Sequence, residues 1–360
     1  MTELRALTGA RGIAAWFVVL YHLRASLGVP DPVLRVLAKG YLAVDFFFLL
    51  SGCVIWLSYA DRIRAQRWLA VPTFLLRRVA RIWPLHLVML GFALLIVAAL
   101  ALTGRPADPR FPLDMLPVHM LLLQNWPLVR ETVGVTALDW NDPAWSISSE
   151  MFAYLLFPLL ALAVDWTRTP TAILLLAVAA SLGVLAYVMR SSGMVTLGQA
   201  IPYFGQLRCV TEFLAGTAIG ALWLRYRADS GPALGLAAAA SALAFTLFGL
   251  GLVSEILAIP TALAGMLLAI ALTSARRGNP LSGRIIHYLG EISFATYLSH
   301  SLLWTAFKMA FVGRPGVLPP LMTALLLALI LLASVALYHL VERPAQRWIN
   351  GLPARRRTRA

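Results

Sequence analysis

Residues 11–22 of the chain read RGIAAWFVVLYH, an apolar run with an arginine at one end and a histidine at the other. Eleven steps of about 100° make three full helical turns plus roughly 20°, so Arg11 and His22 share one helix face, roughly 16 Å apart along the axis. A cation in a bilayer costs several kcal/mol and normally faces a protein interior or a watery cavity. Two interpretations stay open: both residues anchor the helix at the membrane edges, or both face one cavity suited to an anionic ligand and acid–base chemistry.

The composition is typical of a polytopic membrane protein. Of 360 residues, 60% are hydrophobic and only 13% are charged, and the mean hydropathy is +0.79. The net charge of +14 does not indicate nucleic acid, because the arginines lie in short segments between apolar runs. Cys53 and Cys209 both lie in apolar stretches, so we expect no disulfide framework and no metal site. We predict one membrane domain over 1–345 and a basic tail over 346–360.

Apolar runs of membrane-spanning length predict an all-α helix bundle with about ten transmembrane helices. A shorter run over 115–124 lies among prolines, and we expect it to be re-entrant or interfacial. The predicted spans are 10–28, 41–60, 82–103, 148–165, 171–189, 208–226, 233–250, 254–273, 291–312 and 321–341.

The distribution of arginine predicts the orientation. Arginines are concentrated in the tail and in the connections after the second, fourth, sixth and eighth spans, which places both termini in the cytoplasm. We therefore expect a multi-pass protein of a bacterial inner membrane, whose basic tail contacts anionic lipids. The longest connection, 104–147, lies outside in this arrangement and is long enough to cap a binding site. It carries Asp108, Asp114, Asp139 and Asp142.

Several charged residues lie at the predicted span ends. Arg78 and Arg81 are three residues apart on the cytoplasmic side and can converge on one phosphate, or they anchor the helix by the positive-inside rule. Asp45 lies at the same predicted membrane edge as His22, where a carboxylate would orient the imidazole. At the start of the fourth span, Trp145 and Glu150 are either site residues or interfacial and solvated ones.

Two later spans also carry polar residues. Arg208 and Glu212 are followed at the same spacing by Gly216 and Gly220, a pattern that permits close helix packing. In the ninth span, Tyr297 and His300 either line a cavity together or make interhelical hydrogen bonds.

Taken in order, these segments resemble the acyltransferase 3 family of membrane acyltransferases. The chain departs from the family pattern at Thr8, Gly9 and Ala10 and at Cys53. The segments that carry the resemblance are Arg11 and His22 with ten residues between them, GYLAVDFFFLLSG at 40–52, RRVARIWP at 77–84, WSISSE at 145–150, Arg208 to Gly220, ISFATYLSH at 292–300 and ERP at 342–344.

The resemblance implies transfer of an acyl group, which is often acetyl in this family, from cytoplasmic acyl-CoA to a hydroxyl of a carbohydrate, a lipid-linked glycan or a related acceptor. No metal or nucleic acid is implied, and membrane lipids surround the protein. In some members a fused extracytoplasmic hydrolase-like domain completes the transfer. We expect this chain to act without such a fused domain, either alone or with a separate extracytoplasmic transferase. A transporter or flippase, or a non-catalytic assembly protein, is the competing interpretation.

The resemblance also implies a role for each site residue. His22 acts as general base or carries the acyl group as an acyl-imidazole, and Glu150 or Asp45 orients it. The donor-binding residues are Arg11, Arg78 and Arg81, and the substrate-binding residues are Trp145, Tyr297 and His300.

Overall fold

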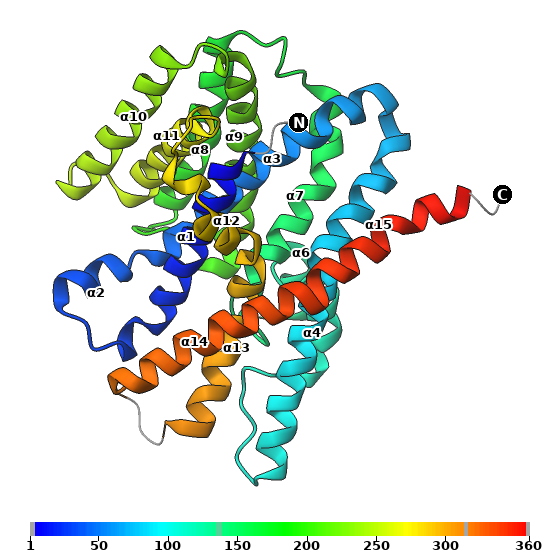
Figure 1. Ribbon diagram of the computed structural model, residues 1–360, viewed down its shortest axis with the longest axis vertical. Coiled ribbons are helices and arrows are strands. Elements are labelled where there is room, and N and C mark those ends of the chain that lie inside the picture. The colour runs from blue at the N-terminus through cyan, green and yellow to red at the C-terminus, as the bar shows by residue number, and fades with distance from the viewer. Residues whose placement is uncertain (1–3, 135, 137, 313–315, 358–360) are drawn as a thin grey trace. The chain divides into compact units, whose positions relative to one another are not determined.

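The computed structural model describes residues 4–134, 136, 138–312 and 316–357, and within these residues the regular structure is entirely helical (Figure 1). Each of the ten predicted spans overlaps one helix of 18 residues or more, which confirms the all-α membrane bundle. These helices are α1 (Arg5–Leu23), α3 (Ala43–Gln66), α4 (Val71–Leu102), α7 (Ala144–Ala163), α8 (Thr171–Ser191), α9 (Ile201–Tyr226), α10 (Gly231–Gly249), α11 (Glu255–Thr273), α13 (Ser293–Phe311) and α14 (Pro320–Leu337).

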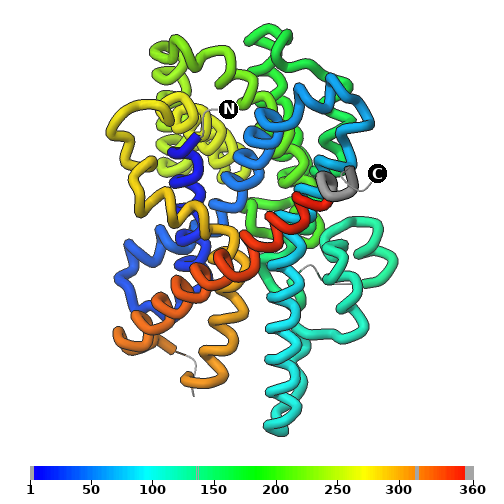
Figure 2. The backbone as a smooth tube through the Cα atoms, turned by 45° about the vertical axis from the view of Figure 1, so that its right-hand side comes forward, coloured from blue at the N-terminus to red at the C-terminus, as the bar shows by residue number. Residues whose placement is uncertain are grey.

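Shorter helices and turns connect the long ones. The α-helices are α2 (Asp31–Leu37), α5 (Leu116–Met120), α6 (Pro127–Val133), α12 (Arg284–Glu291) and α15 (Arg343–Arg357). The 3₁₀ turns are η1 (Arg24–Ser26), η2 (Gly40–Leu42), η3 (Arg67–Ala70), η4 (Leu113–Met115) and η5 (Pro280–Ser282). A π-helical turn, η6 (Tyr338–Glu342), joins α14 to α15, and Figure 2 shows the three as one continuous rod, orange to red. The predicted basic tail falls in α15, and its last three residues lie outside the described residues.

Eight segments of the described chain are long and apolar enough to cross a membrane. One of them, Asp31–Leu102, contains both α3 and α4, so the eight account for nine of the ten predicted spans. The tenth, α13, is not among them because it carries Tyr297, His300 and Lys308 together with several hydroxyl side chains. The predicted span that falls short of this apolar criterion therefore carries two of the predicted site residues, Tyr297 and His300.

The largest shift in a boundary concerns α4. The predicted span begins at 82, after the arginine cluster, whereas the helix begins at Val71 and includes Arg77, Arg78 and Arg81. Arginine is a good helix former, so a cationic cluster changes where the apolar part of a helix starts without ending the helix itself.

The chain divides into two compact units, and both draw on distant parts of the sequence. Unit 1 comprises Met1–Ala14, Tyr41–Val71 and Phe152–Glu291. Unit 2 comprises Ala15–Gly40, Pro72–Met151 and Ile292–Ala360. The long helices α1 and α7 each contribute residues to both units.

Unit 1 is built around α3 and α9, with α8 and α11 against them and α10 against α11 (Figure 1). Its apolar core includes Phe46, Leu49, Ile219 and Leu267, all of them buried. A Cβ on Gly216 would lie 2.0 Å from the Leu49 carbonyl oxygen, so only glycine fits there. The prediction that Gly216 permits close helix packing is therefore confirmed.

Unit 2 has a smaller apolar core, in which the last turns of α1 pack with α13 and α14. The segment after α5 is fastened to the start of α7. Gln124 donates to the Ala144 carbonyl over 3.2 Å, and the Asn125 amide donates to Ser149 Oγ over 2.6 Å. The segment 115–124 thus contains a short helix, α5, and Gln124 and Asn125 hold the first turn of α7 in place.

Candidate active site

His22 lies in the last turn of α1, within unit 2, and its side chain is 24% exposed. Its Nδ1 lies 3.0 Å from the carbonyl oxygen of Val18, one turn earlier. A carbonyl oxygen only accepts hydrogen bonds, so this contact assigns the proton to Nδ1. In the neutral ring Nε2 then carries the lone pair, which is the form that a general base needs.

Asp142 lies on the other side of the ring. Its Oδ2 is 3.2 Å from His22 Nε2, and its side chain is 41% exposed. A carboxylate at this nitrogen favours the imidazolium that forms when Nε2 takes up a proton. Because both side chains reach solvent, a substrate hydroxyl can approach the same nitrogen.

Neighbouring residues hold Asp142 in place. The side-chain amide of Asn141 donates to the carbonyl of Leu298 in α13 over 2.9 Å, and both residues are buried. On the other side, Ser146 Oγ donates to the Pro143 carbonyl over 2.9 Å as α7 begins. The carboxylate is therefore carried on a short segment fixed at both ends.

His300 completes the contacts of His22. Its Nε2 lies 3.2 Å from His22 Nδ1, and its Nδ1 lies 3.3 Å from the Thr296 carbonyl oxygen. With the proton of His300 on Nδ1, its Nε2 accepts from His22 Nδ1–H, which is shared with the Val18 carbonyl oxygen. His300 is fully buried, so it orients His22 from within the protein.

Tyr297 and the start of α7 form the adjoining wall. The Tyr297 hydroxyl and Ser146 Oγ are 2.8 Å apart, and both residues are buried, as is Trp145. The Tyr297 ring centroid lies 6.1 Å from that of His300. Tyr297 thus makes the interhelical hydrogen bond that was one of its two predicted roles, and it does so next to the histidine pair.

The predicted donor-binding arginines of unit 2 differ in their surroundings. Arg81 pairs with the fully buried carboxylate of Glu342, at the end of the π-helical turn, and lies 5.4 Å from the Phe294 ring centroid. Arg78 is half-buried on the same helix. Glu342 belongs to the ERP segment, so two segments of the resemblance that are 261 residues apart in sequence meet here.

Two predicted site residues belong to unit 1. Arg11 donates to the Gly290 carbonyl through Nη2 over 2.7 Å and through Nε over 3.2 Å. Both oxygens of Asp45 accept from Arg208 at 2.9 Å, and both side chains are fully buried. The carboxylate that contacts His22 is Asp142, and the Asp45 carboxylate is bound by Arg208.

Glu150 is half-buried in α7, one turn beyond Ser146. Sequence reasoning placed Glu150 or Asp45 next to His22 and did not single out Asp142. The available signal was position, since Asp142 lies only three residues before Trp145, where the WSISSE segment begins.

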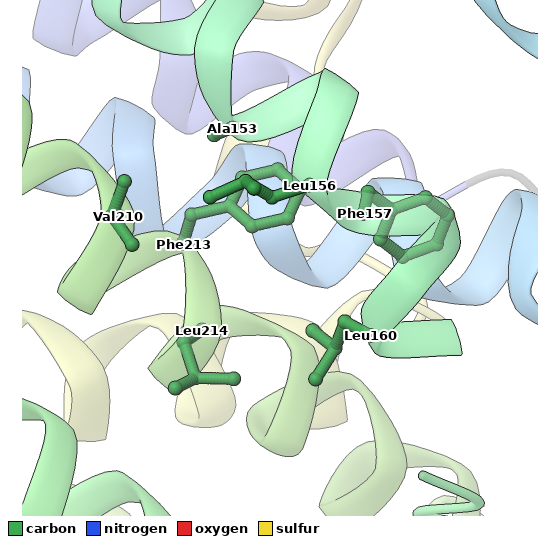
Figure 3. Close-up of a pocket in the computed structure, with 7 residues that line it drawn as sticks. All are labelled: Ala153, Leu156, Phe157, Leu160, Val210, Phe213 and Leu214. Carbon is green, nitrogen blue, oxygen red and sulfur yellow. The ribbon is translucent and has the colours of Figure 1, made fainter. Parts of the chain in front are cut away.

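A separate apolar pocket of about 180 Å³ lies in unit 1 (Figure 3). Its walls come from α7 and α9, and the Phe157 and Phe213 rings meet edge to face with centroids 6.1 Å apart. The lining residues are Ala153, Leu156, Phe157, Leu160, Val210, Phe213 and Leu214. None of them has a side chain able to transfer a proton, so this pocket supplies no catalytic group.

The histidine pair, Asp142, Tyr297 and the start of α7 lie together in unit 2, and comparison with known families agrees with the resemblance. A family profile described as an acyltransferase domain matches residues 4–339. The chain belongs to the acyltransferase 3 family.

Relatives of this family member match part of the chain. Acyltransferase MdmB of Streptomyces mycarofaciens is 37% identical over 164 residues, which cover 44% of this chain and 39% of MdmB. Protein 2 in picA locus of Rhizobium radiobacter is 34% identical over 40% of this chain and 75% of its own length. O-acetyltransferase OatA of Staphylococcus aureus is 29% identical over 43% of this chain and 24% of OatA. The alignments thus span less than half of MdmB and of OatA. No solved structure matches the chain.

Proposed function

We propose that this acyltransferase 3 family member moves an acyl group, acetyl in the simplest case, from cytoplasmic acyl-CoA to a hydroxyl of a carbohydrate or related acceptor. The contact between His22 Nε2 and Asp142 Oδ2 at 3.2 Å carries the proposal, because it couples a base to a carboxylate that stabilises its protonated form. The names of MdmB and OatA support the same chemical class.

In the proposed step, His22 Nε2 takes the proton of the acceptor hydroxyl, and the acceptor oxygen bonds to the acyl carbon. The carbon–sulfur bond breaks, and His22 returns the proton to the departing thiolate, so charge and atoms balance. Asp142 stabilises the imidazolium between these two events, while Val18 and His300 hold Nδ1–H in place. Proton transfer of this kind contributes about 10²–10⁴-fold to a rate.

A covalent route uses the same nitrogen. His22 Nε2 then bonds to the acyl carbon as the thiolate departs, and the acceptor hydroxyl attacks the acyl-imidazole in a second step. Mass spectrometry of protein incubated with acetyl-CoA and no acceptor separates the two routes, since only the covalent one adds an acetyl group to the His22 peptide.

We place the donor phosphates near Arg78 and Arg81, because guanidinium groups bind phosphate through paired hydrogen bonds. Arg81 pairs with Glu342, which fixes its position, and Arg78 lies three residues earlier on the same helix. Arg11 is proposed to contact the pantetheine arm or a phosphate. The protein would act in a bacterial inner membrane, alone or with a separate extracytoplasmic transferase.

The test uses the full chain in lipid nanodiscs with isotope-labelled acetyl-CoA and N-acetylglucosamine as the acceptor probe. Release of CoA and the appearance of labelled sugar are measured for the wild type, for His22→Ala and for His339→Ala, which removes an exposed histidine of η6. We expect label in the sugar with the wild type and the control and none with His22→Ala. In a separate assay with the chain in sealed vesicles, uptake of N-acetylglucosamine with no consumption of thioester would replace this function by transport.

A further inference from the structure

Unit 2 contains a second feature that the proposed reaction has not used, a cleft of about 660 Å³. It lies between the last turn of α4, the following loop and the last turns of α13. Its lining includes three cationic side chains, Arg105, Arg110 and Lys308, and one carboxylate, Asp108. We call it the basic cleft.

Arg110 already uses the only carboxylate among the lining residues. Its guanidinium donates to both oxygens of Asp108, at 2.6 Å through Nη2 and 3.1 Å through Nε. This hydrogen bond lowers the pKa of Asp108, so the carboxylate stays ionised and neutralises one cation. Arg105 and Lys308 are exposed and make no ion pair within the described residues. The basic cleft thus keeps an excess of positive charge in a concave, half-apolar setting, which favours an oxyanion.

The basic cleft lies next to the histidine pair. The backbone N–H of Trp140 donates to the Arg110 carbonyl over 2.8 Å, and Asp142 follows two residues later. Arg110 Nη1 lies 3.5 Å from Thr305 Oγ1, and Thr305 follows His300 by five residues on α13, about 7.5 Å along the helix axis. The pKa of Arg110 is raised mainly by Asp108, and the negative charge of Asp142 adds a smaller effect in the same direction. Asp142 therefore lies near enough to act on Arg110.

From this placement we propose that the basic cleft binds a phosphate or carboxylate of the acceptor while an acceptor hydroxyl lies at His22. The inference rests on the proposed acyl transfer and narrows its substrate class to anionic hydroxylated acceptors. The five residues of α13 from His300 to Thr305 separate the two places by about 7.5 Å along the helix axis, so the charged group and the reacting hydroxyl belong to different parts of one acceptor. A sugar phosphate or an acidic glycan has this character, and a neutral glycan does not.

The experiment compares two probes, N-acetylglucosamine 1-phosphate and neutral N-acetylglucosamine. Binding of each to the full chain, in nanodiscs of zwitterionic lipid and without acetyl-CoA, is measured by calorimetry. We expect the phosphorylated sugar to bind at least about tenfold more tightly than the neutral one. We expect this preference to vanish in the double variant Arg105→Gln, Lys308→Gln and to persist in Arg35→Gln, which removes an exposed arginine of α2.

Equal binding of the two probes, no binding of either, or an unchanged preference in the double variant would overturn the inference. Nanodiscs with anionic phosphatidylglycerol distinguish a lipid headgroup from the acceptor. If these discs abolish sugar-phosphate binding by the wild type at constant ionic strength, the headgroup is the occupant and the acceptor assignment is wrong.

Turnover with acetyl-CoA separates this inference from the proposed function. The ratio of kcat/KM for the charged probe to that for the neutral probe should exceed about ten in the wild type and fall toward one in the double variant. Equal turnover of both probes would leave acyl transfer standing and remove the role of the basic cleft. Selective sugar-phosphate binding without any thioester consumption would leave the anion site standing and remove acyl transfer.

Discussion

Asp142 Oδ2 and His22 Nε2 lie 3.2 Å apart, on the opposite side of the imidazole ring from the Val18 carbonyl that holds Nδ1. The carboxylate therefore contacts Nε2, the nitrogen that would accept a proton, and not Nδ1. In the proposed reaction, a carboxylate at this position would stabilise the imidazolium directly. The segment that carries it is fixed to α13 through Asn141 and to α7 through Ser146.

The first prediction concerns this carboxylate. Asp142→Asn keeps the size of the side chain and removes its charge, so the imidazolium loses its nearest counter-charge. We expect kcat/KM for acetyl transfer to fall about 10–100-fold, part of the range that proton transfer contributes. Asp139→Asn, in the same connection, serves as the control and should retain activity. Equal activity in the two variants would show that Asp142 takes no part in the reaction.

Arg208 should be essential for stability. Arg208 lies on α9, and its buried guanidinium pairs with the carboxylate of Asp45. Arg208→Met therefore leaves the buried charge of Asp45 without its partner. We expect a loss of about 3–5 kcal/mol in unfolding free energy, measured by thermal unfolding in detergent. Arg62→Met, an exposed change on α3, should be nearly neutral.

The double variant Arg208→Met, Asp45→Leu tests the reason for that loss. Replacing both charges by apolar groups should recover part of the stability, because the penalty comes from the unpaired charge. A double variant less stable than Arg208→Met would contradict this account of the pair.

Close packing of α3 against α9 provides another prediction. Gly216→Ala places a methyl group 2.0 Å from the Leu49 carbonyl oxygen, so the two helices must separate. We expect destabilisation of about 1–3 kcal/mol, as for overpacking in a core. Gly183→Ala in α8 meets nothing within 4 Å and should be neutral or slightly stabilising. Equal unfolding temperatures for the two variants would argue against this contact.

The Asp108–Arg110 pair should show a defined pH dependence. Its hydrogen bond holds the pKa of Asp108 below the ordinary value of 3.8, so the folded state binds this proton less tightly than the unfolded state. The contribution to stability is therefore present above about pH 4 and lost as the pH falls through the folded-state value. The difference in unfolding temperature between wild type and Asp108→Asn should be constant from neutral pH to about 5 and disappear in stronger acid. A difference that grows on acidification would have the wrong sign.

Hydropathy and segment order predicted much of this architecture. Ten apolar runs predicted ten long helices, and their order along the chain matched the family that the profile confirms. The sequence also singled out His22, Tyr297 and His300, because a polar residue on an apolar helix is a strong local signal. These three residues lie together in unit 2.

The pairings between distant residues could not be predicted in the same way. Asp142 lies in a long connection without periodicity, and its position depends on the hydrogen bond from Asn141 to Leu298, 157 residues away. The contact between Arg81 and Glu342 likewise joins distant segments. Charge and spacing identify which residues need a partner, whereas packing of the helices decides which partner each one meets.

The most direct test of the account is the initial rate of CoA release at saturating acetyl-CoA and acceptor probe for His22→Gln, compared with the wild type and with His339→Gln. We expect a rate at least about 100-fold lower for His22→Gln, with unchanged thermal unfolding, and a wild-type rate for the control. A well-folded His22→Gln protein that releases CoA within about threefold of the wild-type rate would contradict the assignment of His22 as the base or the acyl carrier.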